Sequence, residues 1–173
     1  SPAHRQHLFE AAQSAGRLDV LINNASTLGP LPMPSMGSYR LDEFQRVYEV
    51  NTYAPLALIQ GLRLLLANSY GMVVNLSSDA AVGGYEGWGG YGSSKAALDL
   101  ISLTLANELK EEGIAVVSVD PGDMRTDMHQ DAFPGEDISD RPPPEVTLPF
   151  WAWLFGQDPA AVSGQRFLAQ SEL

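Results

Sequence analysis

The sequence predicts an α/β protein built on a doubly wound parallel sheet. Three short, mostly unalternating β-branched runs support this prediction: LDVLINN at 18–24, GMVVNLSS at 71–78 and IAVVSVDPG at 114–122. Such runs are typical of parallel strands that are buried on both faces. Helical stretches separate the runs, and right-handed crossovers place helices on both faces of a parallel sheet.

The helices are expected at residues 2–16, 41–67 and 92–112. Pro55 lies inside the second of them, in VNTYAP. Proline has no N–H, so the carbonyl of Asn51 loses its helical donor and the helix should kink. A freed carbonyl can hold an ordered water, although a simple break between two helices fits the same pattern.

The last third of the chain is less regular. Residues 121–145 are rich in Pro and Asp and contain RPPPE, which is typical of a lid, a binding loop or a disordered segment. A short apolar helix is expected at 145–155 and a last strand at 164–169. No repeat or linker divides the chain, so residues 1–173 are interpreted as a single domain.

Composition excludes several function classes. A net charge of −11 with only two lysines disfavours nucleic acid as a partner. The absence of cysteine excludes disulfides, thiolate metal sites and cysteine nucleophiles. There is no apolar run long enough to span a membrane and no signal peptide, so we expect a cytoplasmic protein without a membrane partner.

No metal site is predicted, because a protein-bound metal needs three or four convergent ligands. His4 and His7 lie on the first helix and His129 lies in the acidic loop, a pattern that favours solvated side chains. A solvated lid is likewise favoured over a cation site for the acids that repeat every four residues, Asp123, Asp127 and Asp131. There is also no G-x-S-x-G motif for serine hydrolysis.

Polar residues follow the three predicted strands where each one ends, at Asn23-Asn24, Ser77-Ser78 and Asp120-Pro121-Gly122. Ligands of open parallel sheets bind outside the carboxyl ends of the strands. Polar residues often do no more than end a strand. Three such ends at one rim, together with Tyr91 and Lys95, indicate a site.

The stretch YEGWGGYGSSK at 85–95 contains a G-x-G-x-x-G pattern, Gly87, Gly89 and Gly92. A dinucleotide-binding turn must follow its strand directly, yet this pattern begins nine residues after Ser78. The glycines are therefore expected to let the backbone approach a ligand closely rather than to cradle phosphates.

The same stretch places Tyr91 and Lys95 four residues apart, on one face of a helix. An ammonium near a phenol lowers the pKa of the phenol from about 10. Such a phenol can exchange a proton with a carbonyl or alcohol oxygen. An isolated pair of this kind would be interpreted as a surface tyrosine on a lysine stem, but Ser78 could hydrogen-bond the same oxygen.

These motifs together resemble the short-chain dehydrogenase/reductase family, of the classical type. NNAS at 23–26 resembles N-N-A-G, YGSSK at 91–95 resembles Y-x-x-x-K, and PGDMRT at 121–126 resembles P-G-x-x-x-T. Asn51 in VNTYAP and Ser78 in VVNLSS complete the set. All occur in the family's order and spacing, and the resemblance covers essentially the whole chain.

The resemblance implies an NAD(P)-dependent oxidoreductase that interconverts a secondary alcohol and a ketone by hydride transfer. It assigns Tyr91 as the acid/base and Ser78 as the residue that orients the substrate oxygen. Lys95 would lower the pKa of Tyr91 and bind the nicotinamide ribose, and Asn51 would hold a relay water.

The resemblance further implies a cofactor, NAD or NADP, whose choice cannot be read from this sequence. Asn23 and Ala25 would lie along its adenosine side. The nicotinamide end would be bound by Tyr91 and Lys95 and by residues after the third strand, Pro121, Gly122, Met124 and Thr126. Family members usually form homodimers or homotetramers, and the resemblance implies a contact here through the helices at 53–67 and 91–112 and the C-terminal elements.

Two departures from the family pattern stand out. Ser26 replaces the glycine of N-N-A-G, where it either crowds the turn or adds one hydrogen bond, and we expect it to be tolerated. The family's first three strands and its T-G-x-x-x-G-x-G turn, roughly 60–80 residues, are not found in this sequence. The strand at 18–24 is therefore expected to be exposed, and the 173-residue chain to bind NAD(P)H weakly.

Two interpretations of this second departure stay open. The favoured one is that the chain is a fragment of a longer enzyme. The other is a truncated relative that serves as a non-catalytic binding or assembly module.

Aromatic and methionine side chains could line a substrate pocket beside Tyr91, which would suit apolar or ring-containing substrates. The candidates are Trp88, Trp151, Trp153, Tyr85, Met128 and Phe133. For Trp151 and Trp153, core packing or a subunit contact is an equal alternative.

Overall fold

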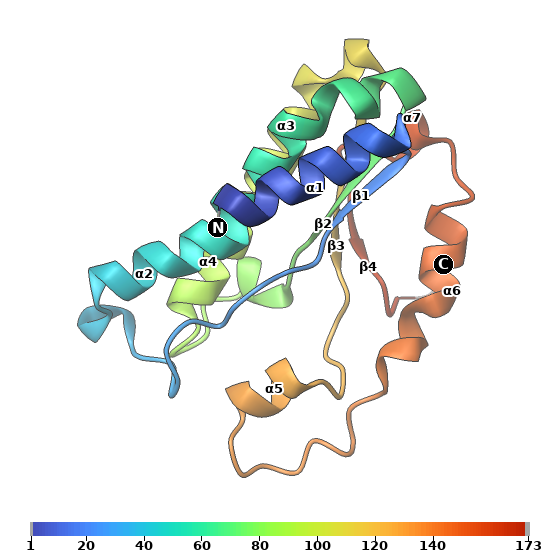
Figure 1. Cartoon of the computed structure of the whole chain (residues 1–173). Coiled ribbons are helices and arrows are strands. Elements are labelled where there is room, and N and C mark those ends of the chain that lie inside the picture. Colours follow the sequence, from blue (N-terminus) through green and yellow to red (C-terminus); the bar gives the residue numbers. More distant parts are fainter. Residues whose placement is uncertain (1, 172–173) are drawn as a thin grey trace.

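Four parallel strands form the sheet in a computed structural model that describes residues 2–171 (Figure 1). Their order follows the chain: β1 (Val20–Asn23), β2 (Met72–Leu76), β3 (Ala115–Asp120) and β4 (Arg166–Leu168). This confirms the predicted α/β fold with a parallel sheet. Each strand is shorter than its apolar run, because the polar residues after it leave the sheet at the rim.

The strand register brings the carboxyl ends of the strands to one level. Asn23 of β1 is opposite Asn75 of β2, and Asn75 is opposite Ser118 of β3. Every residue of β2 and β3 is buried, which agrees with the unalternating runs in the sequence. The residues that follow these strands are thereby held next to one another.

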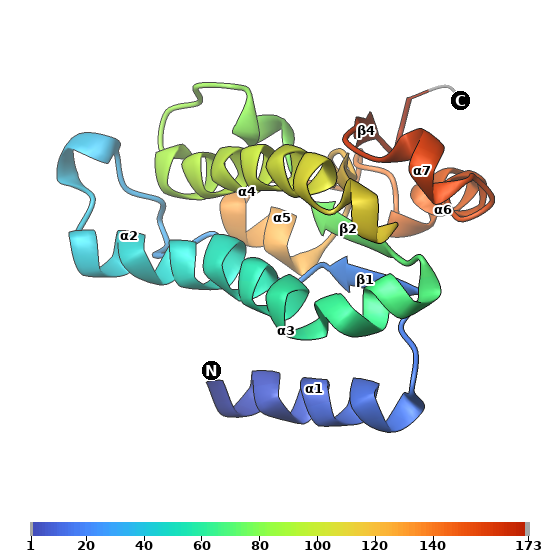
Figure 2. The same cartoon turned by 90° about the horizontal axis from the view of Figure 1, so that it is seen from above.

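Helices cover the two faces of the sheet, as Figure 2 shows from above. One face carries α1 (Pro2–Ala15), α3 (Ala54–Ser69) and α4 (Gly89–Glu108), which pack on the layer that contains Val73 and Val116. The other face carries α6 (Leu148–Leu154) and α7 (Pro159–Val162).

The predicted helix at 41–67 is three elements. An α-helix, α2 (Leu41–Tyr48), leads into a π-helical turn at Glu49–Tyr53 and then into α3. The N–H of Ala54 donates to the carbonyl of Glu49, five residues back, so the helical ladder widens just before Pro55. The expected kink is therefore a π-helical turn, and Asn51 lies in it.

The segment 121–145 also contains a helix that the sequence analysis missed, α5 (Asp127–Ala132). Thr126 caps it, because its side-chain oxygen accepts a hydrogen bond from the N–H of His129. A threonine followed by an acidic first turn is an N-terminal helix signal. The Pro and Asp content of the loop concealed it.

One edge of the sheet is open. Among the described residues β1 pairs only with β2, and its Val20 and Ile22 are 37% and 48% exposed. They share a face with Met72 and Val74 of β2, which belong to the core under α6 and α7, but these two helices do not extend over β1 (Figure 1). The expected exposure of this strand is confirmed. Within the described chain, no helix is long and apolar enough to cross a membrane.

Candidate active site

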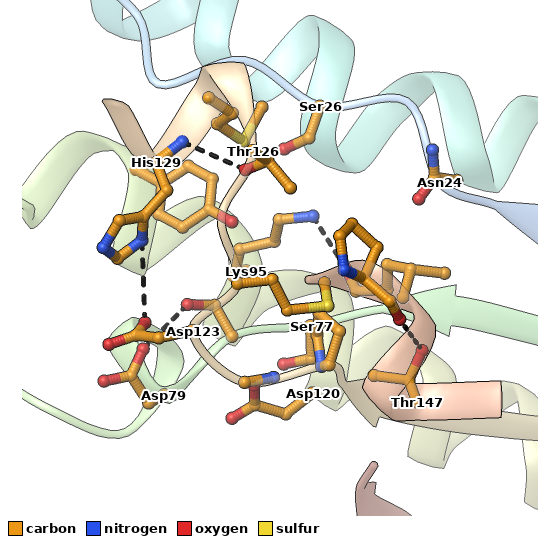
Figure 3. A pocket seen from close by; sticks show the side chains of 18 of the residues that line it. Asn24, Ser26, Ser77, Asp79, Lys95, Asp120, Asp123, Thr126, His129 and Thr147 are labelled. Carbon is orange, nitrogen blue, oxygen red and sulfur yellow. Dashed lines mark hydrogen bonds and ion pairs between the residues drawn. The ribbon is translucent and has the colours of Figure 1, made fainter. Parts of the chain in front are cut away.

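A cavity of about 450 Å³ lies at the carboxyl ends of the first three strands (Figure 3). It is lined by the loop after β1, the end of β2, the first turns of α4, the segment after β3 and the start of α6. Its polar lining includes Asn24, Ser26, Ser77, Ser78, Tyr91, Lys95, Asp120 and Thr126. The structure thus brings Ser78, Tyr91 and Lys95 into one cavity, as their motifs predict.

Tyr91 lies in the first turn of α4 and is buried. Burial raises the pKa of its phenol above the ordinary value of 10.0, and the neighbouring hydroxyls of Ser78 and Ser26 oppose that rise in pKa. The indole of Trp88 meets its ring edge-on at a centroid distance of 5.8 Å. The phenol therefore forms part of the cavity wall together with both serines.

Lys95 is one turn further along α4 and only 2% exposed. Its Nζ donates to the carbonyl of Leu76 at 2.7 Å, at the end of β2. Burial lowers the pKa of this ammonium from 10.5 to about 8, while the carboxylate of Asp99 acts to raise it. A buried lysine in a cleft with a shifted pKa is typical of a functional site.

The pKa of Tyr91 is raised because of its burial, and the lowering expected from Lys95 stays a prediction. The Lys95 ammonium is bound to Leu76 and lies 5.6 Å from the centre of the Tyr91 ring.

Ser78 is the second residue after β2 and opens a 3₁₀ turn at Asp79–Ala81. Its Oγ accepts from the N–H of Ala80 at 3.2 Å and donates to the carboxylate of Asp79 at 3.0 Å. These contacts hold the serine in the wall of the cavity that Tyr91 also lines. Ser77, the residue before it, is directed the other way and donates to Asp99 at 2.7 Å.

Asn51 is completely buried and does not line the cavity. Its Nδ2 donates to the carbonyl of Thr27 at 2.9 Å and to the hydroxyl of Ser94 at 3.0 Å. Its Oδ1 accepts from the N–H of Thr27 at 2.9 Å and from the hydroxyl of Ser26 at 3.1 Å. The asparagine therefore ties the loop after β1 to the catalytic helix α4.

The residues predicted to bind the cofactor divide into two groups. The four after β3 line the cavity: Pro121, Gly122, Met124 and Thr126. Asn23 and Ala25 do not line it. The amide of Asn23 donates to Asn75 at 2.7 Å inside the sheet, and Ala25 is exposed beside it.

Arg166 on the last strand hydrogen-bonds to residues at the carboxyl ends of the neighbouring strands. The sequence analysis did not single it out. The guanidinium of Arg166 donates to Asp99 and to Asp120, each at 3.0 Å, and to the carbonyl of Ser78 at 2.8 Å. It thereby links β4, α4, β3 and the residue that follows β2. The signal in the sequence was a lone arginine in the otherwise apolar run GQRFLA.

The glycines of GWGGYG serve packing within the protein rather than a ligand, which corrects the expectation. A Cβ built on Gly90 would lie 2.5 Å from the ring of Tyr39. One on Gly92 would lie 2.4 Å from the carbonyl of Ala80, and one on Gly89 2.3 Å from Met36. Glycines at the start of α4 leave out side chains there, and neighbouring segments can therefore approach the helix closely.

Three of the six candidate apolar residues line the cavity: Trp88, Met128 and Trp151. Trp153 instead packs on Phe150 and Phe167 in the core. Phe133 packs behind Trp88, and Tyr85 is exposed. The cavity also gains Leu28, which the sequence analysis did not single out.

Residues 2–171 contain no group of three or more His, Cys, Asp or Glu side chains that could hold a metal ion. The imidazole of His129 lies 3.8 Å from the carboxylate of Asp123 and stacks on Phe133. It forms part of the cavity wall.

Comparison with known proteins agrees with this geometry. The sequence model of the short chain dehydrogenase family matches residues 1–137. The uncharacterized oxidoreductase YciK of Escherichia coli K12 is 35% identical over 156 residues, covering 89% of this chain and 60% of that protein. Benzil reductase of Bacillus subtilis is 41% identical over 112 residues, covering 62% of this chain and 45% of that protein.

Solved structures extend the likeness over nearly the whole chain. A short chain dehydrogenase of Shigella flexneri complexed with NADP superimposes with a TM-score of 0.88 at 32% identity. That match covers 99% of this chain and 71% of the other. The chain spans well under two thirds of the length of the curated relatives named above. The family model, which matches well over half of the residues, shows that this chain belongs to the short chain dehydrogenase family.

Proposed function

We propose that this chain carries the catalytic centre of an NAD(P)-dependent oxidoreductase that interconverts a secondary alcohol and a ketone. One observation supports this most directly: Ser78, Tyr91 and Lys95 line one cavity at the carboxyl ends of the strands. The segment after β2 and the first turns of α4 bring them together, and Lys95 is buried there with a lowered pKa, which is typical of a functional group.

In the proposed reaction Tyr91 moves the proton. It donates to the carbonyl oxygen during reduction and accepts from the hydroxyl during oxidation. Ser78 lines the same cavity as Tyr91 and would orient the same substrate oxygen. Trp88 and Trp151 exclude water from this part of the cavity.

The described residues fit the nicotinamide end of a cofactor. Lys95 carries three N–H donors, and the structure records one hydrogen bond, to Leu76, so two can reach ribose hydroxyls. The hydroxyl of Thr126 accepts from the N–H of His129 and keeps its own proton to donate. The hydride is supplied or accepted by the nicotinamide when the cofactor is bound.

NADP(H) is the first cofactor to test, because the Shigella flexneri relative was solved with NADP. The backbone of Pro121-Gly122 lines the same cavity, and Gly122 adopts a φ of +74° with its N–H on Asp120. A side chain at Gly122 would be strained and would meet Gln170. This turn offers backbone rather than side chain to the ligand.

We further propose a neutral substrate that carries an apolar or aromatic group next to the reacting carbon. Leu28, Trp88, Met128 and Trp151 form the apolar wall, and the cavity of about 450 Å³ has room for a ring. Asp79 and Asp123 at the rim disfavour anions. The Bacillus subtilis relative, benzil reductase, supports this class by its name.

A homodimer or homotetramer through α3 and α4 remains part of the proposal. Both helices expose leucines on their outer faces: Leu64 is 78% exposed and Leu100 66% exposed. Large exposed apolar side chains on neighbouring helices are typical of a subunit contact. Analytical ultracentrifugation with a Leu64→Glu, Leu100→Glu double variant tests it, and an unchanged mass would contradict this contact.

The second candidate function is a binding or assembly module that holds no cofactor. The edge of β1, which is open among the described residues, favours it. Calorimetric titration of the 173-residue chain with NADPH separates the two. Weak or absent binding is expected for the chain alone, and micromolar affinity would exclude the module.

The catalytic proposal is tested by Tyr91→Phe in protein that binds the cofactor. Turnover should fall by at least about 10²-fold while the dissociation constant for NADPH changes little. Tyr70→Phe is the matched control, because Tyr70 is 73% exposed at the far end of α3. Turnover retained by Tyr91→Phe would disprove the assignment.

A further inference from the structure

Lys95 is a lysine that lies inside the cavity without a carboxylate partner. Its side chain is buried and lines the cavity, and Figure 3 shows it among the other lining side chains. Within residues 2–171 it forms no ion pair, and the hydrogen bond recorded for its Nζ goes to the carbonyl of Leu76 at 2.7 Å. A carbonyl oxygen accepts a hydrogen from a neutral amine as well as from an ammonium, so this contact does not require a charge.

The carboxylates of this region are bound to another cation. Asp99 lies one turn after Lys95 on α4, and its Oδ2 accepts from Arg166 at 3.0 Å and from the hydroxyl of Ser77 at 2.7 Å. Asp120, at the end of β3, also pairs with Arg166 at 3.0 Å. Because a buried ammonium without a partner is costly, this arrangement favours the neutral amine. The pKa of Lys95, lowered to about 8 by burial, agrees with it.

A neutral lysine amine is a nucleophile that adds to carbonyl carbons, and desolvated lysines form Schiff bases for this reason. The cavity around this amine suits apolar carbonyl compounds. Leu28, Trp88 and Met128 contribute apolar side chains to its wall, and its volume of about 450 Å³ has room for a ring. Asp79 and Asp123 line the same cavity and disfavour anions.

We propose that Lys95 is a covalent modification site, whose amine forms a reversible Schiff base with neutral apolar or aromatic aldehydes that enter the cavity. This activity is additional to the proposed oxidoreductase reaction and does not depend on it. In that reaction the same nitrogen would bind the nicotinamide ribose, so the aldehyde adduct and the cofactor would compete for Lys95.

The reaction needs no oxidant and no reductant. The lone pair of Nζ forms the C–N bond, and a proton moves from the nitrogen to the former carbonyl oxygen to give a carbinolamine. The C–O bond then breaks, and the hydroxyl leaves as water with a proton from Tyr91, whose ring centre lies 5.6 Å from Nζ. The phenolate takes the remaining proton of the iminium nitrogen. The products are an imine and water, and Tyr91 is unchanged.

The test uses the 173-residue chain without cofactor and benzaldehyde as the probe, at the pKa of Lys95, about pH 8. Sodium cyanoborohydride reduces each imine to a secondary amine, so a benzyl group stays on every nitrogen that reacted. Tandem mass spectrometry of the peptides locates and quantifies these groups. Lys110 is the other lysine of the chain and is exposed, so it serves as the reference in the same sample. The α-amino group is quantified separately.

Lys95 should carry at least about tenfold more benzyl adduct than Lys110, because a larger fraction of its amine is neutral at this pH. Lys95→Met should remove this adduct, and Lys110→Met should leave it unchanged. Urea should abolish the preference, because the cavity is lost on unfolding. Equal labelling of the two lysines in the folded chain would overturn the proposal, as would a preference that persists in urea.

Glyoxylate, an aldehyde that carries a carboxylate, tests the class of ligand. It should label Lys95 at least about tenfold less, relative to Lys110, than benzaldehyde does, because an apolar wall and two carboxylates disfavour an anion. The same preference for Lys95 with both aldehydes would contradict capture by the cavity and would leave only a reactive amine.

These readouts need neither cofactor nor turnover, so the inference and the proposed function fail separately. If the protein turns over no alcohol but benzaldehyde selects Lys95, the proposed function fails and the modification site stands. If turnover is normal and the two lysines are labelled equally, only the modification site fails.

Discussion

The two edges of the sheet are built in different ways. β4 is only three residues long, yet its Arg166 binds two carboxylates and a backbone carbonyl on three other elements. β1 has four residues and turns Val20 and Ile22 outward, half-exposed, with pairing on one side only among residues 2–171.

This difference shows where the described chain supports its own chemistry. The proposed catalytic groups lie between β2 and β3, next to the edge that Arg166 cross-links. The loop after β1 is instead joined to α4 by the hydrogen bonds of Asn51 and by the packing of Leu28 on Tyr91. The cross-linked side should be sensitive to single substitutions, and the open side should tolerate them.

The largest effect is expected for Arg166→Gln. Asp99 and Asp120 would lose their cationic partner while both stay mostly buried, which should cost about 3 to 4 kcal/mol in the free energy of unfolding. Turnover should fall as well, because the carbonyl of Ser78 loses a donor. Urea denaturation and steady-state kinetics measure both. A loss below about 1 kcal/mol would show that the edges do not differ in this way.

The next prediction compares the same substitution, isoleucine to alanine, next to the buried strand β3 and on the open edge strand β1. Ile114→Ala, just before β3, empties a site that is 1% exposed and should cost about 3 kcal/mol. Ile22→Ala, on β1, removes a side chain that is 48% exposed and should cost less than about 1 kcal/mol. Denaturant unfolding of the pair gives the difference. Equal losses would mean that β1 is packed as tightly as β3.

The pH dependence of the free energy of unfolding distinguishes the buried Lys95 from the exposed Lys110. Its pKa is about 8 in the folded protein and 10.5 ordinarily, so the unfolded chain binds more protons between these values. Stability should therefore rise with pH across that window, by roughly 2 kcal/mol. Below pH 8 the cost of the buried charge is fully present.

Lys95→Met should remove this rise in stability, and the exposed Lys110→Met should keep it. Urea denaturation between pH 8 and 10.5 measures both variants. A rise that survives in Lys95→Met would refute the assignment.

The smallest effect is expected for Arg63→Gln. Arg63 pairs with Glu112 on the outer surface, with half of its side chain exposed. Exposed ion pairs contribute about 0 to 1 kcal/mol, because water screens both charges. The variant is thus the control for Arg166→Gln, measured in the same urea titrations. A loss as large as that of Arg166→Gln would point to a general effect of arginine removal.

Much of this protein could be predicted from its sequence alone. The three apolar runs and the stretch GQRFLA predicted the four strands. The physical reason holds best for β2 and β3, because a strand buried on both faces needs a continuous stretch of apolar side chains. The i,i+4 spacing placed Tyr91 and Lys95 on one helix face, and the strand ends placed Ser78 beside them. Pro55 predicted the distortion at Asn51, because the missing N–H is a local property.

Contacts between residues far apart in sequence were decided by the tertiary structure. Arg166 meets Asp99 across 67 positions, and Ser26 meets Asn51 across 25. The inward turn of Asn23 and the packing of Met36 and Tyr39 on the bare start of α4 are of the same kind. Local spacing carries no information on such pairs, because their geometry follows from strand order and register. The acidity of Tyr91 also belongs here, since burial depends on the whole fold around the phenol.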